Sequence, residues 1–304
     1  MAVSTKISFG HRLVALGWGA YLNLFGAMPI ETASRRCAGL VKAIGPLTSA
    51  HSTAIRNLRL AFPNETEAWR QDVRRAMWDG IGRVAGEFPH LHEINAYEPG
   101  GRIEVTGVER LDAVKASGQG AVFISGHFAN WELMAAAIVQ RGVPCQVTYR
   151  PANNPIIDAD IIRIRSHYGA KMQAAKGKEG GMGLLRALKA GETIALMNDQ
   201  KYNEGVAAPL FGYDCMTADG PTRLALRFNV PLIPVSIKRR PGARYHVTVH
   251  DPIPLDDTAH QETEIPAAVR RINAFMEARI KEAPQDWFWV HRRWPKEAWT
   301  AAGV

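Results

Sequence analysis

The chain has 304 residues, of which 46% are hydrophobic; this excludes a disordered protein and suffices for one large α/β domain or two small ones. Its 37 Lys and Arg against 29 Asp and Glu give a formal net charge of +8, which favours nucleic acid, anionic lipid headgroups or an acidic protein partner without choosing among them. Cys37, Cys145 and Cys215 lie far apart without CxxC spacing, so we expect reduced thiols in a cytosolic compartment, not a zinc site or a disulfide framework.

The first predicted element is an uncharged run from Leu13 to Ile30, LVALGWGAYLNLFGAMPI. Its length and the interfacial residue types Trp18 and Tyr21 predict membrane association, and they leave open whether the segment spans the bilayer or lies on it. A signal peptide is disfavoured because the run is long and no A-x-A cleavage pattern follows it. The alternative is a buried or interfacial helix. We expect residues 1–54 to form a membrane-associating helical segment and residues 55–304 a single α/β domain.

The pattern of hydrophobic residues changes along the chain. Residues 67–88 carry apolar positions at helical spacing, which predicts a long helix in a helical N-terminal third. From Arg102 onward, short apolar runs alternate with amphipathic stretches, which predicts an α/β fold with a mixed central sheet flanked by helices. Predicted strands cover residues 121–125, 145–149, 193–198, 232–238 and 245–250, and predicted helices cover residues 129–140, 156–168, 182–190, 222–228 and 267–282.

His127 follows the strand over 121–125, at the carboxyl edge of the sheet where ligands of open α/β folds bind. Glu132 comes five residues later, and on one continuous helix the two side chains would point about 140° apart. They can meet only if His127 precedes the helix, in the turn that begins at Gly126. Glu132 could then fix the imidazole tautomer while the other ring nitrogen takes a proton from a substrate hydroxyl. The pattern predicts His127 as a general base and Glu132 as its charged partner.

The same residues have other interpretations, which their spacing helps to separate. A helix-capping His127 with a solvated Glu132 is the structural alternative. A zincin site needs histidines at i and i+4 with a third ligand, and none is suitably spaced, so we expect no metal and no other cofactor. Ser125 lacks the G-x-S-x-G elbow that exposes the nucleophile of a serine hydrolase.

Polar residues also follow the ends of two further predicted strands. Because these strand ends should meet at one edge of the sheet, we expect their side chains to lie beside His127. An arginine there can hold a phosphate or stabilise the oxyanion of an acyl-transfer intermediate. An ion pair between Arg150 and Asp199, or a turn-forming role for that aspartate, is the structural alternative. The residues expected to bind substrate are Arg150 and Asn154 in TYRPANNP, and Asp199 and Gln200 in MNDQKYNEG.

At these segments the sequence resembles the bacterial lipid A biosynthesis (late) acyltransferases of the lauroyl and myristoyl type, which are related to glycerolipid acyltransferases with an H-x4-D/E motif. The resemblance rests on GHFANWEL, YRPANNP, NDQ followed by PLFG, VPLIPVSI and WFWVHRRW, which occur in this order between Ile55 and Pro295. It implies a glycerol-3-phosphate acyltransferase-like fold and an inner-membrane enzyme with a cytoplasmic active site. The implied reaction transfers an acyl group from an acyl carrier protein thioester to a hydroxyl of a lipid A precursor.

The resemblance also assigns residues. The catalytic histidine and acid of the family fall on His127 and Glu132, and its aspartate-glutamine pair is similar to Asp199 and Gln200. The sequence departs from the family at Asn198, where many relatives carry proline.

The implied partners agree with the net charge, because acyl carrier protein and an anionic membrane surface are both acidic. We expect no nucleic acid, since no basic helix with stacking aromatics lies outside the tail over 286–295. In that tail, Arg292 and Arg293 could bind headgroups, or the whole segment could dock into the core. Two other functions stay open: an acyl-CoA-dependent acyltransferase acting on another glycolipid or a lysophospholipid, and a non-catalytic membrane-binding protein.

Overall fold

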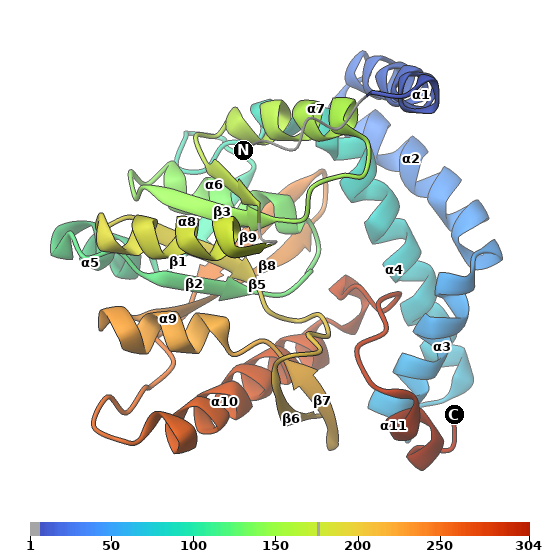
Figure 1. Ribbon diagram of the computed structural model, residues 1–304. Coiled ribbons are helices and arrows are strands. Elements are labelled where there is room, and N and C mark those ends of the chain that lie inside the picture. The colour runs from blue at the N-terminus through green and yellow to red at the C-terminus, as the bar shows by residue number, and fades with distance from the viewer. Residues whose placement is uncertain (1–6, 175–176) are drawn as a thin grey trace.

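The computed structural model describes residues 7–174 and 177–304, and within them four helices precede the first strand (Figure 1). The side chain of Ser8 accepts a hydrogen bond from the His11 N–H at the start of the first helix, and Thr66 does the same for the Trp69 N–H at the start of the fourth. The four helices are α1 (Phe9–Gly26), α2 (Ile30–Ile44), α3 (Ser49–Ala61) and α4 (Glu67–Glu87).

Two glycines let α2 and α4 pack in close contact. A Cβ atom on Gly82 would lie 2.6 Å from the Cα of Ala38, and one on Gly86 would lie 2.5 Å from the carbonyl oxygen of Ala33. The backbones of the two helices therefore meet where side chains are absent. The helix predicted over residues 67–88 is confirmed.

The uncharged run forms α1 and continues to the first residue of α2, with a break after Gly26. Among the residues that the structure describes, no helix is both long and apolar enough to cross a membrane. Along α1, Trp18 packs against the core, whereas Phe9 and Leu16 face outward with 82% and 71% of their surface exposed. The boundary expected at residue 54 falls within α3, and the division into an N-terminal membrane-associating segment and a single α/β domain stays a prediction.

A seven-stranded mixed sheet lies beside these helices, which confirms the predicted fold class. All neighbouring strands are parallel except β8 and β9, which form an antiparallel hairpin. Every residue of the central strand β2 is buried. In sheet order the strands are β1 (Ile103–Thr106), β9 (Arg244–Val249), β8 (Leu232–Arg240), β2 (Val122–Ser125), β5 (Thr193–Met197), β3 (Cys145–Tyr149) and β4 (Lys171–Ala174).

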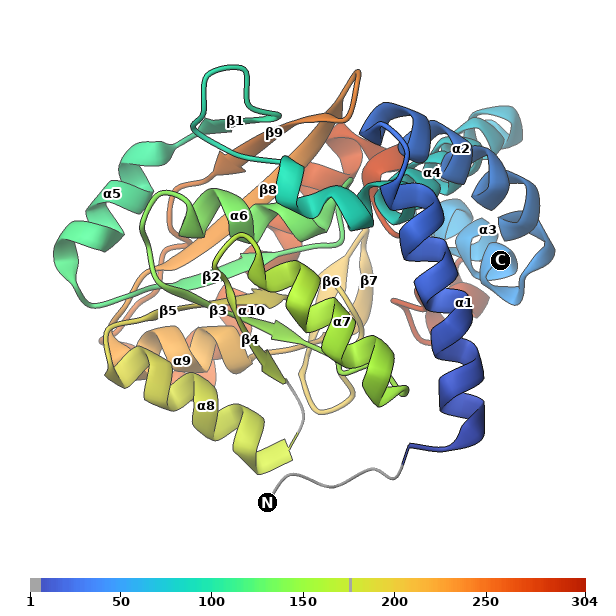
Figure 2. The ribbon, with the colours of Figure 1, turned by 90° about the horizontal axis from the view of Figure 1, so that it is seen from above.

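Helices cover both faces of the sheet. The short helix α6 packs on β3 and β8, and α9 packs on β2 and β8 from the opposite side (Figure 1). Figure 2 shows α1 running beside α7. The helices after β1 are α5 (Val108–Ser117), α6 (Met134–Val139), α7 (Pro155–Ser166), α8 (Gly177–Lys189), α9 (Gly220–Phe228), α10 (Gln261–Glu282) and α11 (Lys296–Ala301).

Several elements were not predicted from the sequence. They are the helices α5 and α11, the edge strands β1 and β4, and a separate hairpin of β6 (Val206–Leu210) and β7 (Tyr213–Thr217) that packs against α10. The strands are four or five residues long. Short edge strands give a weak alternation signal, which explains why they were missed.

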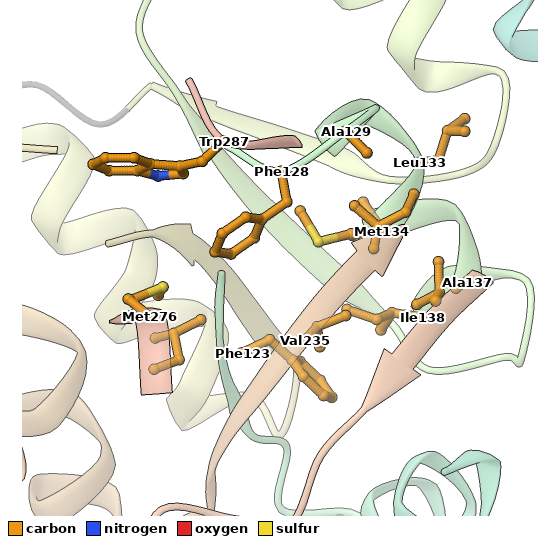
Figure 3. Packing of buried hydrophobic residues seen from close by; sticks show 14 of the residues in the cluster. Phe123, Phe128, Ala129, Leu133, Met134, Ala137, Ile138, Val235, Met276 and Trp287 are labelled. Atoms are coloured by element: carbon orange, nitrogen blue, oxygen red, sulfur yellow. The ribbon is translucent and has the colours of Figure 1, made fainter. Parts of the chain in front are cut away.

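The aromatic tail after α10 lies in the core. Trp287, Trp289 and Trp294 are fully buried, and Figure 3 shows Trp287 next to Phe128 at one end of the packed cluster. Arg293 is also buried, and its guanidinium donates to the carbonyl oxygen of Met216 at 2.7 Å. Of the two placements left open for the tail, docking into the core is therefore the observed one, and Arg293 is not available to lipid headgroups.

Candidate active site

The loop after β2 places His127 at the carboxyl edge of the sheet. Gly126 makes the turn possible, because a Cβ atom there would lie 2.7 Å from the ring of Phe128 and 3.2 Å from the Cβ of Asp199. His127 precedes a short 3₁₀ helix, Trp131–Leu133, as the H-x4-E spacing requires. Ala129, in the intervening turn, has a positive φ of 44°, and its N–H donates to the carbonyl oxygen of Asp286 at 2.7 Å. The tail thus fixes this turn.

Asp199 holds the imidazole in place. It follows β5, the parallel neighbour of β2, and its Oδ1 lies 2.8 Å from Nδ1 of His127. Its other oxygen accepts from the backbone N–H of His127 and from the indole N–H of Trp287, both at 2.8 Å. Asp199 is 3% exposed, whereas 18% of the His127 side chain is exposed. Because the carboxylate engages Nδ1, the remaining ring nitrogen, Nε2, is the one available to a substrate.

Charge and burial oppose each other in this pair. Burial by itself would lower the pKa of His127, but the charge of Asp199 and its hydrogen bond outweigh burial, so the pKa lies above its ordinary value of 6.5. Burial would raise the pKa of Asp199, yet the charge of His127 and the three hydrogen bonds lower it to about 2. Asp199 is therefore ionised at neutral pH and accepts the Nδ1 proton.

The prediction that Glu132 binds the imidazole of His127 is wrong. Glu132 instead forms a bidentate ion pair with Arg165 of α7, with distances of 2.7 Å from Nε and 2.6 Å from the terminal nitrogen. The planar guanidinium fork matches a carboxylate, and Asp199 already occupies Nδ1 of the imidazole. The charge of Glu132 still acts on His127, because it contributes to the raised pKa of the imidazole.

His127, held by Asp199, lies at the edge of a hollow of about 510 Å³ between β3, α7 and the His127 loop. Asn154, in contrast, is not among the described residues that line it. Its side chain caps α7 by accepting from the Ile156 N–H at 3.1 Å, and it donates to the carbonyl oxygen of His11 in α1 at 2.7 Å. Lining residues with polar or aromatic side chains include His127, Trp131, Glu132, Arg150, Arg165 and Gln200.

Sequence reasoning missed Arg165. It lies inside a predicted helix, 33 residues from Glu132, with no strand-end position to single it out. Three of the four expected substrate-binding residues do lie at the site, because Arg150 and Gln200 line the hollow and Asp199 contacts His127. The described residues contain no group of three or more His, Cys, Asp or Glu side chains that could hold a metal ion.

An apolar slot adjoins the polar hollow. The slot lies between α6 and the central strands, and the two spaces share Trp131, Ala135, Val147 and Met197 in their walls. Ser125 lies in the slot with its hydroxyl donating to the carbonyl oxygen of Val235 at 2.6 Å, which agrees with its exclusion as a nucleophile. The slot is small, with a volume of about 50 Å³.

A polar hollow with a buried His–Asp pair, at the carboxyl edge of a mixed sheet, is the arrangement expected of the active site of an α/β enzyme. The sequence profile of the family described as bacterial lipid A biosynthesis acyltransferase matches residues 5–296, so the chain belongs to this family. The chain is therefore an acyltransferase of lipid A biosynthesis, and the family inferred from the sequence is confirmed.

Two sequence relatives agree with the family assignment. The lipid A biosynthesis lauroyltransferase of Escherichia coli (strain K12) is 30% identical over 251 residues, which cover 78% of this chain and 76% of the relative. The lipid A biosynthesis palmitoleoyltransferase of the same organism is 25% identical and covers 81% and 79% of the two chains. Among solved structures, the crystal structure of the 1-acyl-sn-glycerophosphate acyltransferase PlsC from Thermotoga maritima aligns with a TM-score of 0.36 at 12% identity, over 84% of this chain and 96% of that one.

Proposed function

We propose that the protein transfers a fatty acyl group from an acyl carrier protein thioester to a hydroxyl of a lipid A precursor, with His127 as the general base. The observation that carries this proposal is the hydrogen bond between His127 and the buried Asp199 at the edge of the hollow. It supports a role for Nε2 as the basic nitrogen, since Nδ1 donates to the carboxylate.

The reaction needs only a proton carrier and charge stabilisation. Nε2 of His127 takes the proton of the acceptor hydroxyl as its oxygen attacks the thioester carbon, which gives a tetrahedral oxyanion. When the intermediate collapses, the carbon–sulfur bond breaks and the imidazolium returns the proton to the thiolate. Asp199 stabilises the imidazolium between these steps. No protein nucleophile is required, because the attacking group belongs to the substrate.

Glu132 remains part of the proposed machinery through Arg165. The bidentate pair fixes the guanidinium at the wall of the hollow, where its remaining N–H groups and those of Arg150 could stabilise the oxyanion. Gln200 lines the same space and offers a neutral donor and acceptor. The apolar slot that adjoins this hollow has a volume of about 50 Å³, so it could hold only a small part of the acyl chain.

The donor and the location are proposed from charge and surface character. A net charge of +8 favours an acidic carrier protein and an anionic membrane surface. The exposed stripe of Phe9, Leu13, Leu16 and Leu24 on α1 supports attachment to the cytoplasmic face of the inner membrane. No nucleic acid enters the proposal. The competing assignment is an acyltransferase that uses acyl-CoA as donor and another glycolipid or a lysophospholipid as acceptor.

The test is acyl transfer by His127→Ala protein in detergent, with acyl carrier protein thioester and lipid A precursor as substrates and products read by mass. Loss of the base should lower the rate by ~10²- to 10⁴-fold while the circular dichroism spectrum stays the same. His260→Ala, which removes an exposed histidine, is the matched control and should keep full activity. A folded His127→Ala protein with normal turnover would contradict the mechanism. Transfer from acyl-CoA but not from the carrier protein thioester would show that acyl-CoA is the donor.

A further inference from the structure

A second, larger cleft of about 720 Å³ lies between α4, the β8–β9 hairpin and residues Gln285 and Asp286. It is separate from the hollow at His127, and the proposed reaction gives it no role. Its α4 wall presents Arg75, Asp79 and Arg83, which are spaced four residues apart and so share one helix face. Arg239 and Arg240 of the hairpin line the opposite wall.

The basic side chains of this cleft are not all neutralised. Lys42 and Arg83 share Asp79, and Arg239 pairs with the buried Glu87 at 2.6 Å. Among the described residues, neither Arg75 nor Arg240 has a carboxylate within ion-pair distance, and the buried Nε of Arg239 has no hydrogen-bond partner. The buried Nε of Arg239 is out of reach of a ligand, so the cleft offers the guanidinium groups of the exposed Arg75 and Arg240, and guanidinium is the group that best recognises a phosphate.

The cleft lies next to the reaction centre but is not continuous with it. A hollow of about 10 Å³ lies between them; it shares Gly80, Gln285 and Asp286 with the basic cleft, and it shares Trp131 with the hollow at His127. A substrate with a reacting hydroxyl at one end and an anionic group further along could extend from one space to the other across these shared walls.

We propose that the cleft binds a phosphomonoester of the glycolipid acceptor through Arg75 and Arg240, and so positions the acceptor with its hydroxyl at His127. This inference rests on the proposed function, because it takes the acceptor to be a phosphorylated lipid A precursor. A concave polar site suits a sugar phosphate. The walls also carry Asp72, Asp79 and Asp286, and Asp79 is already paired with Lys42 and Arg83, so the binding of an anion would depend on Arg75 and Arg240.

The experiment compares acceptors with and without phosphate. Turnover is measured with the wild-type protein and with the double variant Arg75→Gln plus Arg240→Gln, on the phosphorylated precursor and on the same precursor treated with a phosphatase. Direct binding of both lipids in detergent is measured in parallel. Arg270→Gln removes an exposed arginine of α10 and is the control for loss of charge.

We expect the double variant to raise the KM and the dissociation constant for the phosphorylated acceptor by roughly 10- to 100-fold, with little change in kcat. On the dephosphorylated acceptor, the wild-type protein and the variant should behave alike, since the interacting group is gone. Equal losses on both acceptors, or an unchanged KM, would overturn the inference. A rise in the KM of the acyl donor instead would assign the cleft to the carrier protein.

The direct binding measurement separates this inference from the proposed function. Phosphate-dependent binding without acyl transfer would refute the function and keep the cleft assignment. Acyl transfer with phosphate-independent binding would keep the function and refute the cleft. Unfolding temperatures of the variants show whether either arginine supports the fold.

Discussion

Nδ1 of His127 donates its proton to the buried carboxylate of Asp199. Asp199 is buried and receives hydrogen bonds from the His127 N–H and from Trp287, so the imidazole has one orientation and one tautomer. A general base must be neutral to take a proton, and the pKa of His127 lies above its ordinary value. Activity should therefore rise with pH through that raised pKa and level off above it.

Asp199→Asn tests whether the charge of Asp199 raises the pKa of His127. The substitution removes the charge that raises the pKa of His127 and leaves burial, which lowers it, so the acid limb of the kcat/KM profile should move to lower pH. The rate on the plateau should fall by ~10²- to 10⁴-fold, because the amide does not stabilise the imidazolium and can favour the wrong tautomer. A pH profile of kcat/KM for both proteins measures the two effects. An unmoved acid limb would show that His127 is not the titrating group.

The site was predictable where it depends on strand ends. His127, Arg150, Asp199 and Gln200 each follow a strand whose apolar run is visible in the sequence, and parallel strands deliver such residues to one edge. The pairing of their side chains was not predictable. Which of two carboxylates reaches the imidazole depends on the turn at Ala129 and on where α7 places Arg165, and both are set by packing between distant segments.

At the scale of elements, the contact between α2 and α4 depends on two glycines of α4. Gly86→Ala would push a methyl group against the carbonyl oxygen of Ala33, which should destabilise the protein by about 1–3 kcal/mol. Gly80 lies on the same helix, where an added Cβ atom would have no heavy atom within 4 Å, so Gly80→Ala should stabilise the protein by about 0.5–1 kcal/mol. Urea denaturation of both variants measures the difference. A Gly86→Ala protein as stable as Gly80→Ala would contradict the close packing of the two helices.

Elements with strong periodicity were predicted well. The central strands are short runs of buried apolar residues, and α4 and α10 have the 3.6-residue spacing that a packed helix needs. The edge strands and the β6–β7 hairpin owe their conformation to neighbours more than to their own residues, since one of their faces is open to solvent. The helix expected over 129–140 begins later, because residues before Met134 form the turn after His127 and a 3₁₀ helix.

At the scale of the whole molecule, the outward stripe of α1 is the surface that we expect to meet the membrane. Leu13→Asp combined with Leu16→Asp should lower binding to anionic vesicles by at least ~10-fold, because each buried leucine contributes roughly 1.5–3 kcal/mol. The remaining binding should weaken further at high salt, since it depends on the basic surface. Co-sedimentation with vesicles measures both effects.

Met182→Asp is the matched control for that experiment. Met182 is an exposed hydrophobic residue of α8, and its substitution should leave vesicle binding near the wild-type level. If both proteins lose binding equally, the attachment is not specific to α1. If neither loses it, the basic surface alone carries the interaction.

The contacts between the His127 turn and the tail also have a consequence for biosynthesis. The Trp287 indole completes the hydrogen bonds of Asp199, and the Asp286 carbonyl accepts from the Ala129 N–H, yet both residues are translated after every strand of the sheet. Because synthesis runs from the N-terminus, a nascent chain cannot complete the hydrogen bonds around His127 before residues 286 and 287 have been made.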